Sequence, residues 1–190
     1  NFVNIEPRVT RNPQNQTLDL TFALTRGPRV FVERIDIEGN TTTLDEVIRR
    51  QFTVVEGDPF NPREIRNAAE RIRALGYFSD AQVNSRQGSS EQQVIVDVNV
   101  EEQPTGSLTL GASYGVNSGV GVNISLNETN FLGRGQTVGV TLSTADGDRA
   151  GVLNFVEPFF LGRDLRFGFN AAYHETENWN SDYDTRSIAV

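Results

Sequence analysis

Polar and apolar positions along the chain follow two different periods. Between residues 29 and 104, strand-like alternation is interrupted by two segments whose apolar residues recur every three or four positions, as on one face of a helix. After residue 104 the pattern alternates in twos, segment after segment, which is the period of a strand. The pattern therefore predicts a mixed α+β unit followed by a run of strands.

A hairpin is predicted ahead of the mixed unit. Residues 2–10 and 17–25 have the composition of strands, and a polar, turn-rich stretch separates them. A two-stranded hairpin alone is only marginally stable in water. We therefore expect residues 1–28 to be the end of a domain whose beginning lies outside this sequence.

The mixed unit, residues 29–104, is predicted to run β-α-α-β-β. Thr43 and Glu46 have the spacing of a capping box at the start of the first helix. Asn61 and Pro62 are typical of the start of the second helix, and Gly76 of its end. Two helices on one face of a three-stranded sheet make an α+β domain. Its strands are expected at residues 30–37, 78–87 and 93–103.

The second half is predicted to be a set of antiparallel transmembrane strands. Each alternating segment is about ten residues long, and tilted strands of roughly 9–11 residues cross a bilayer core. One face is apolar and the other carries Gly, Ser, Thr and Asn, as expected between lipid and a wet lumen. Residues 149–157 alternate poorly and are assigned by their position between other strands. The segments are 107–114, 120–127, 138–143, 149–157 and 165–173, with a sixth beginning near 185.

Two further observations support a barrel. Aromatic residues gather near the strand ends, as at a membrane interface; they are Phe131, Phe159, Phe160, Tyr173 and Trp179. An open sheet cannot stand in lipid, because its edges leave backbone groups without partners. We therefore expect an incomplete barrel that continues beyond Val190.

Composition changes at Pro104 and excludes several classes of function. Residues 1–104 hold 5 of the 17 glycines and 28 of the 42 charged side chains. The net charge of -8 argues against nucleic-acid binding, which needs clustered basic residues. The absence of cysteine excludes disulfides and thiolate metal sites. No catalytic constellation, metal site or cofactor site is predicted, so we expect a protein that is not an enzyme.

Short motifs along the chain resemble, in their order, the BamA family of Gram-negative outer-membrane protein assembly factors. The α+β unit resembles the POTRA domain of that family, and the motifs span almost the whole sequence. They are residues 35–40 (Ile-Asp-Ile-Glu-Gly-Asn), 47–50 (Val-Ile-Arg-Arg), 56–58 (Glu-Gly-Asp), 73–78 (Arg-Ala-Leu-Gly-Tyr-Phe), 98–102 (Val-Asn-Val-Glu-Glu), 106–108 (Gly-Ser-Leu), 130–135 (Asn-Phe-Leu-Gly-Arg-Gly) and 157–160 (Glu-Pro-Phe-Phe).

The resemblance implies a domain order and a location. Residues 1–28 would be the end of one POTRA domain, residues 29–104 the last POTRA domain, and residues 105–190 the first strands of a 16-stranded outer-membrane barrel. The POTRA part would lie in the periplasm. There it would meet accessory lipoproteins of the BamD type and unfolded outer-membrane protein clients.

The resemblance also implies two sites. The turn Glu56-Gly57-Asp58, with Arg49 and Arg50, would contact a partner lipoprotein. The first barrel strand would offer its edge to client strands at a seam that opens toward the lipid. The edge residues are Ser107, Leu108, Thr109, Leu110, Gly111, Ala112, Ser113 and Tyr114. Pairing at an edge uses the backbone, which suits clients of many sequences.

Two alternative interpretations remain open at this point. The chain could belong to a related POTRA-bearing protein, either a TamA-like assembly factor or a two-partner secretion transporter. It could also be a soluble periplasmic binding module followed by a β-sandwich, in which case residues 105–190 would need no detergent.

Overall fold

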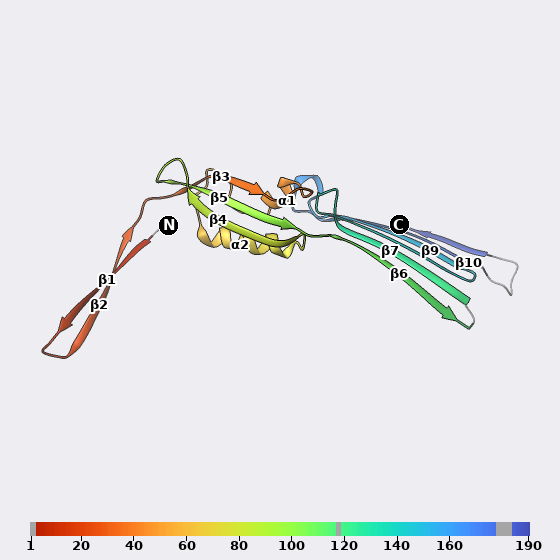
Figure 1. Cartoon of the computed structure of the whole chain (residues 1–190), viewed down its shortest axis with the longest axis horizontal. Helices are drawn as coiled ribbons and strands as arrows, with labels where there is room; N and C mark the ends of the chain where they lie inside the picture. The colour runs from red at the N-terminus through yellow and green to blue at the C-terminus, as the bar shows by residue number, and fades with distance from the viewer. Residues whose placement is uncertain (1–2, 117–118, 178–183) are drawn as a thin grey trace.

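The computed structural model describes residues 3–116, 119–177 and 184–190. The chain forms an elongated row of three units, with a hairpin at one end, an α+β domain in the middle and a long sheet at the other end (Figure 1). Trp179 and most of the loop around it lie outside the described residues. In the described ranges, no helix is long and apolar enough to span a bilayer.

The hairpin consists of β1 (Val3–Asn12) and β2 (Thr17–Arg26), paired antiparallel from Val3↔Arg26 to Asn12↔Thr17. Its apolar side chains remain exposed, Phe22 to 57% and Leu24 to 66%. The predicted pair of strands is therefore present, and the described residues do not cover its apolar face.

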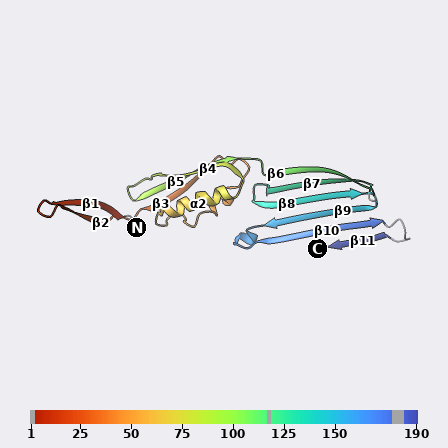
Figure 2. The same cartoon turned by 90° about the horizontal axis from the view of Figure 1, so that it is seen from below.

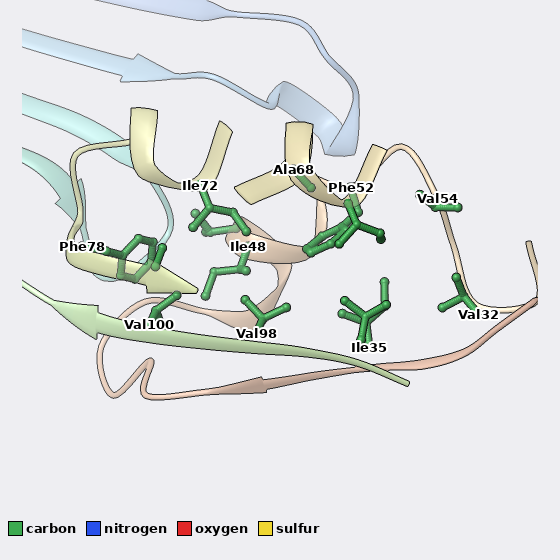
Figure 3. Packing of buried hydrophobic residues seen from close by; sticks show 14 of the residues in the cluster. Val32, Ile35, Ile48, Phe52, Val54, Ala68, Ile72, Phe78, Val98 and Val100 are labelled. Carbon is green, nitrogen blue, oxygen red and sulfur yellow. The ribbon is translucent and has the colours of Figure 1, made fainter. Parts of the chain in front are cut away.

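The α+β domain has the predicted β-α-α-β-β order. Its sheet has the strand order β3-β5-β4, with β3 parallel and β4 antiparallel to the central β5. Both helices lie on one face of this sheet, as Figure 3 shows for the residues they bury. The elements are β3 (Phe31–Glu38), α1 (Asp45–Arg49), α2 (Pro62–Ala74), β4 (Phe78–Gln87) and β5 (Gln93–Glu102).

A single hydrophobic core holds this domain together. Ile48 of α1 and Ile72 of α2 are fully buried, and they face Val98 of β5 (Figure 3); Val96 of β5 is buried in the same core. Burying one such side chain stabilises the fold by roughly 1.5–3 kcal/mol. In the described part of the chain, every buried apolar side chain lies between Val32 and Val100.

The ends of α2 follow the local sequence. The Asn61 side chain accepts a hydrogen bond from the Arg63 amide at 3.1 Å, and Pro62 is the first helical residue. Gly76 follows the helix with a φ of +74°, a left-handed conformation that glycine adopts without strain. Both predicted boundaries are confirmed.

The predicted capping box of the first helix is wrong. α1 has only five residues, its N-cap is Leu44, and no side chain caps it. The Thr43 hydroxyl instead accepts a hydrogen bond from Asn130, which lies 87 positions further along the chain. The local spacing predicted that the Thr43 hydroxyl caps the helix, but the hydroxyl makes a tertiary contact with Asn130 instead.

The long sheet is antiparallel throughout, with strands in chain order from β6 at one edge to β11 at the other (Figure 2). The poorly alternating segment is a strand, β9, as predicted. A short 3₁₀ turn, Phe160–Gly162, precedes β10, which begins two residues later than predicted. The strands are β6 (Gly106–Gly115), β7 (Gly119–Phe131), β8 (Gln136–Ala145), β9 (Asp148–Glu157), β10 (Phe167–Glu177) and β11 (Asp184–Ala189).

The sheet does not close on itself. Among the described residues, β6 pairs only with β7, and β11 pairs only with β10. The fold is therefore an α+β domain followed by an incomplete antiparallel barrel.

Candidate functional site

The two predicted sites lie in different units of the molecule. The residues predicted to bind a partner belong to the α+β domain, where α1 meets the turn after Val55. The edge predicted to receive clients is β6, at the margin of the long sheet (Figure 1). Among the described residues, no group of three or more His, Asp or Glu side chains is arranged to hold a metal ion.

Arg49 and Glu56 form one hydrogen-bonded unit with the backbone of β3. Arg49 Nη1 donates to Glu56 Oε1 at 3.1 Å, and its Nη2 donates to the carbonyl of Ile35 at 2.9 Å. The amide of Ile35 in turn donates to Glu56 Oε1 at 3.2 Å. Both charged side chains remain about half exposed, at 43% and 49%. We call this pair the Arg49–Glu56 surface.

The turn after Glu56 keeps this surface in place. The Gly57 amide donates to the Val32 carbonyl at 2.7 Å, and Asp58 Oδ2 accepts from the Val55 amide at 3.0 Å. Gly57 has a φ of +93°, which favours glycine. A shallow hollow of about 330 Å³ lies beside the turn, lined by Ile35, Arg49, Val54, Val55 and Glu56. A charged pair beside exposed valine could contact a protein partner.

Arg50 lies in different surroundings from Arg49, although the two are adjacent in sequence. Its Nη2 donates to the carbonyl of Arg134 at 3.3 Å, and its guanidinium lies 4.2 Å from the centroid of the Phe159 ring. Burial lowers the pKa of Arg50 from its usual value. The structure therefore brings Arg49, Glu56, Gly57 and Asp58 together and places Arg50 against the turns of the long sheet.

Among the residues that the structure describes, no strand pairs with the outer side of β6. The register with β7 runs from Gly106↔Glu128 to Gly115↔Gly119, so one side of the strand is fully paired. The large apolar side chains of β6 are exposed, Leu110 to 70% and Tyr114 to 77%. An unpaired edge of this kind is a template for another strand.

The register shows which backbone groups of β6 bond to β7 and which point to the open edge. The Thr129 amide donates to the Thr105 carbonyl at 3.3 Å, and paired positions in an antiparallel ladder alternate between bonded and non-bonded. Ser107, Thr109, Gly111 and Ser113 therefore bond to β7. The amides and carbonyls of the other four predicted edge residues point to the open side; these are Leu108, Leu110, Ala112 and Tyr114.

Sequence reasoning missed Glu102, the last residue of β5. Its carboxylate accepts hydrogen bonds from the Thr41 hydroxyl at 2.7 Å and from the amides of Thr42 and Thr43 at 2.9 and 2.6 Å. Partial burial by itself would raise the pKa of Glu102, but these hydrogen bonds more than offset it and lower the pKa from 4.5 to about 2. Nothing in the local sequence links residues 60 positions apart.

Comparison with known families agrees with this architecture. The POTRA family model, described as surface antigen variable number repeat, matches residues 30–103. The Omp85 superfamily domain model matches residues 130–190.

Related proteins carry similar sequences over most of this chain. The outer membrane protein assembly factor BamA of Nitratidesulfovibrio vulgaris is 28% identical over 187 residues, or 98% of this chain and 23% of the relative. BamA of Neisseria meningitidis is 27% identical over 84% of this chain and 20% of the relative. A putative outer membrane protein assembly factor of Treponema pallidum is 33% identical over 90% of this chain. The chain thus spans about a fifth of the length of these relatives.

Solved structures show the same arrangement. BamA from Haemophilus ducreyi lacking POTRA domains 1–3 superposes with a TM-score of 0.75 at 25% identity, over 95% of this chain and 34% of that one. CdiB from Escherichia coli, with a TM-score of 0.54 at 16% identity over 97% of this chain and 35% of that one, shares the fold. The chain therefore has a region that matches the POTRA family, followed by strands that match the Omp85 superfamily domain and form an incomplete β-barrel, and it is similar to BamA along nearly its whole length.

Proposed function

We propose that this chain is part of a factor that folds β-barrel proteins into the bacterial outer membrane. The observation that carries the proposal is the open edge of β6, which follows directly after a POTRA domain. The relatives described as outer membrane protein assembly factors support it. In this function β6 receives a client strand, and no bond in the client is chemically changed, so the protein is not an enzyme.

The chemistry of the β6 edge suits a general template. The outward amides and carbonyls of Leu108, Leu110 and Ala112 offer ladder bonds to any strand, whatever its side chains. Each such bond contributes about 0.5–1.5 kcal/mol net in water. An unpaired backbone group costs more where water is scarce, so a client strand is favoured most strongly at a seam within the membrane.

We propose that the Arg49–Glu56 surface and the turn through Gly57 and Asp58 dock an accessory lipoprotein of the BamD type. The exposed charged pair can offer both a donor and an acceptor to a partner, beside the apolar Val55. Arg50 is left out of this docking surface, because its guanidinium is engaged by Phe159 and Arg134.

The same proposal assigns each of the three units to a domain and, for the last two, to a compartment of the cell. Residues 1–28 form the end of a preceding POTRA domain, residues 29–104 the last POTRA domain in the periplasm, and residues 105–190 the first strands in the outer membrane. The exposed apolar side chains of β1 and β2 then face the rest of their own domain. Those of β6 to β10 then face lipid.

The test uses the direction of each β6 amide. Leu110→Pro removes an amide that points to the open edge, where proline is tolerated, and leaves the bonds to β7 in place. We expect Leu110→Pro to lose client insertion in reconstituted liposomes while its own barrel still folds. Leu110→Ala keeps the amide and should retain most insertion.

Two results would count against the proposal. If a folded Leu110→Pro variant inserts clients normally, pairing of the client with the β6 edge is not part of the mechanism. Secretion of a single soluble partner, with no insertion of barrel clients, would favour a two-partner secretion transporter instead.

A further inference from the structure

The end of β7 and the turn that leads to β8, residues 130–135, lie against the POTRA domain. Asn130 is only 6% exposed and Thr43 only 3%, which is unusual for polar residues. Asn130 Nδ2 donates to the Thr43 hydroxyl at 2.8 Å, and Asn130 Oδ1 accepts from the Gly135 amide at 2.8 Å. One buried side chain thus joins the two domains and shapes its own turn. We call residues 130–135 the junction turn.

The backbones of the two domains approach each other closely at Gly133. The Leu44 amide, at the start of α1, donates to the Gly133 carbonyl at 2.9 Å. Gly133 has a φ of +71°, and a Cβ placed there would lie 1.9 Å from the Thr42 carbonyl oxygen. No residue with a side chain fits this position unless the domains move apart. The junction turn therefore supplies the N-terminal cap that α1 lacks within its own domain.

A second set of contacts flanks this approach. The Tyr77 hydroxyl donates to the Gly135 carbonyl at 3.4 Å, and burial raises the pKa of Tyr77. A Cβ on Gly135 would lie 2.5 Å from Arg50 Nη2, whose guanidinium also packs on Phe159. The contact thus extends from the β7–β8 turn to the segment before β10.

The covalent connection between the domains is also fixed at both ends. On the POTRA side, the Gln103 amide donates to the Tyr77 carbonyl at 3.0 Å, and its side chain donates to the Gly76 carbonyl at 2.9 Å. On the sheet side, the Thr105 hydroxyl donates to Glu128, and the Thr129 hydroxyl donates to the Thr105 carbonyl. Only Pro104 lies between these anchors, and its ring restricts rotation.

We propose that the junction turn is a docking element that holds the POTRA domain in one orientation against the rim of the sheet. The POTRA domain and strands β6 to β10 then move as one body. Any movement that opens the edge of β6 must carry the POTRA domain with it. This last consequence rests on the function proposed above, whereas the docking itself does not.

Gly133 and Gly162 make a matched pair of variants for the test. Both have a φ of +71°, so an alanine at either position meets the same backbone strain. A Cβ on Gly133 would collide with Thr42, whereas a Cβ on Gly162 would meet nothing within 4 Å. Only Gly133→Ala should therefore separate the domains.

The orientation can be measured by pulsed electron spin resonance on the full-length protein in lipid. Spin labels are placed at Glu70→Cys on α2 and Thr144→Cys on β8, both exposed, in a background without other cysteines. We expect one narrow distance distribution for the parent protein and for Gly162→Ala. Gly133→Ala should lose that single peak and show a broad distribution.

Asn130→Ala provides a second, milder test in case Gly133→Ala does not fold. It removes the bond to Thr43 without a collision and should also broaden the distribution. Unchanged distributions in both folded variants, or in Asn130→Ala when Gly133→Ala does not fold, would overturn the docking proposal. If the distance distributions broaden but client insertion stays normal, the docking is supported and its coupling to the opening of the β6 edge is overturned. Failure of the assembly function itself is read separately, from Leu110→Pro.

Discussion

Strands of the POTRA domain and of the long sheet share the same alternation of apolar and polar residues, but their apolar faces differ in exposure. The apolar face is buried in the POTRA domain and exposed in the long sheet. In β5, Val96 and Val98 are 0% and 1% exposed, because α1 and α2 cover that face. In β6, Leu108 and Leu110 are 63% and 70% exposed, and no helix in the described part of the chain covers them. Alternation thus specifies a strand with one apolar face, while the surroundings specify what covers the face. For the sheet, the proposed cover is the lipid of the outer membrane.

The largest expected effect comes from opening the POTRA core. Ile72→Ala should destabilise the POTRA domain by about 2–5 kcal/mol, because it leaves a cavity among fully buried side chains. Leu110→Ala, at an exposed position, should leave the stability of that domain unchanged. Hydrogen–deuterium exchange of the α2 amides measures both variants. Equal protection of α2 in the two variants would show that the core does not stabilise this domain.

A charge on the apolar face of β6 tests what covers the sheet. Leu110→Arg should destabilise the barrel by about 2–4 kcal/mol if this face meets the middle of the bilayer. Thr109→Arg places the same charge on the opposite, polar face and should cost much less. The folded fraction after urea titration in lipid vesicles compares them. A soluble sandwich would instead tolerate Leu110→Arg, since water would already cover that face.

Acid should weaken the POTRA domain through Glu102. The pKa of this carboxyl is about 2 in the folded state, below its ordinary value of 4.5, so its contribution is complete above pH 4.5 and is lost as the pH falls toward 2. Glu102→Gln should lower stability by about 1–2 kcal/mol at neutral pH, since a charged acceptor becomes neutral. Glu102→Gln should also reduce the loss of stability of the POTRA domain as the pH falls.

The pH dependence of exchange at the amides of Thr42 and Thr43 measures this effect. Other carboxylates titrate in the same range, so the comparison is the difference between the parent protein and Glu102→Gln. Identical profiles in the two proteins would contradict the role given to Glu102.

The smallest expected effect on stability is at the Arg49–Glu56 surface. Arg49→Ala should cost less than about 1 kcal/mol, because both partners are half exposed. It should nevertheless weaken binding of the accessory lipoprotein. Arg86→Ala removes partly exposed ion pairs with Asp36 and Asp97, away from this surface, and should leave that binding unchanged. Surface plasmon resonance with the lipoprotein compares the two, and equal affinities would exclude Arg49 from the docking surface.

Local signals predicted the elements well where neighbours in sequence are also neighbours in space. The α2 boundaries rest on Asn61, Pro62 and Gly76, each of which acts within one or two turns of the helix. The strands likewise follow from alternation, and even β9 was assigned correctly from its position between other strands. The first helix is present as predicted, but its capping box was wrong, because the Leu44 amide at its N-terminus donates to the Gly133 carbonyl, far along the chain.

The predicted partner-binding site was likewise predictable only in part from the sequence. Glu56, Gly57 and Asp58 are consecutive, so any structure would keep them together. Arg49 and Arg50 are also consecutive, yet α1 directs the first to Glu56 and the second to Phe159. Only the fold shows that they serve different contacts.

The sequence by itself determined which segments are strands and helices, and which face of each strand is apolar. It did so because those properties depend on residues two to four positions apart. The tertiary structure alone decided which β6 amides point to the open edge, since that depends on the register with β7. It alone also joined Thr43 to Asn130 and Glu102 to residues 41–43, because contacts between residues about 60 to 90 positions apart have no local signature.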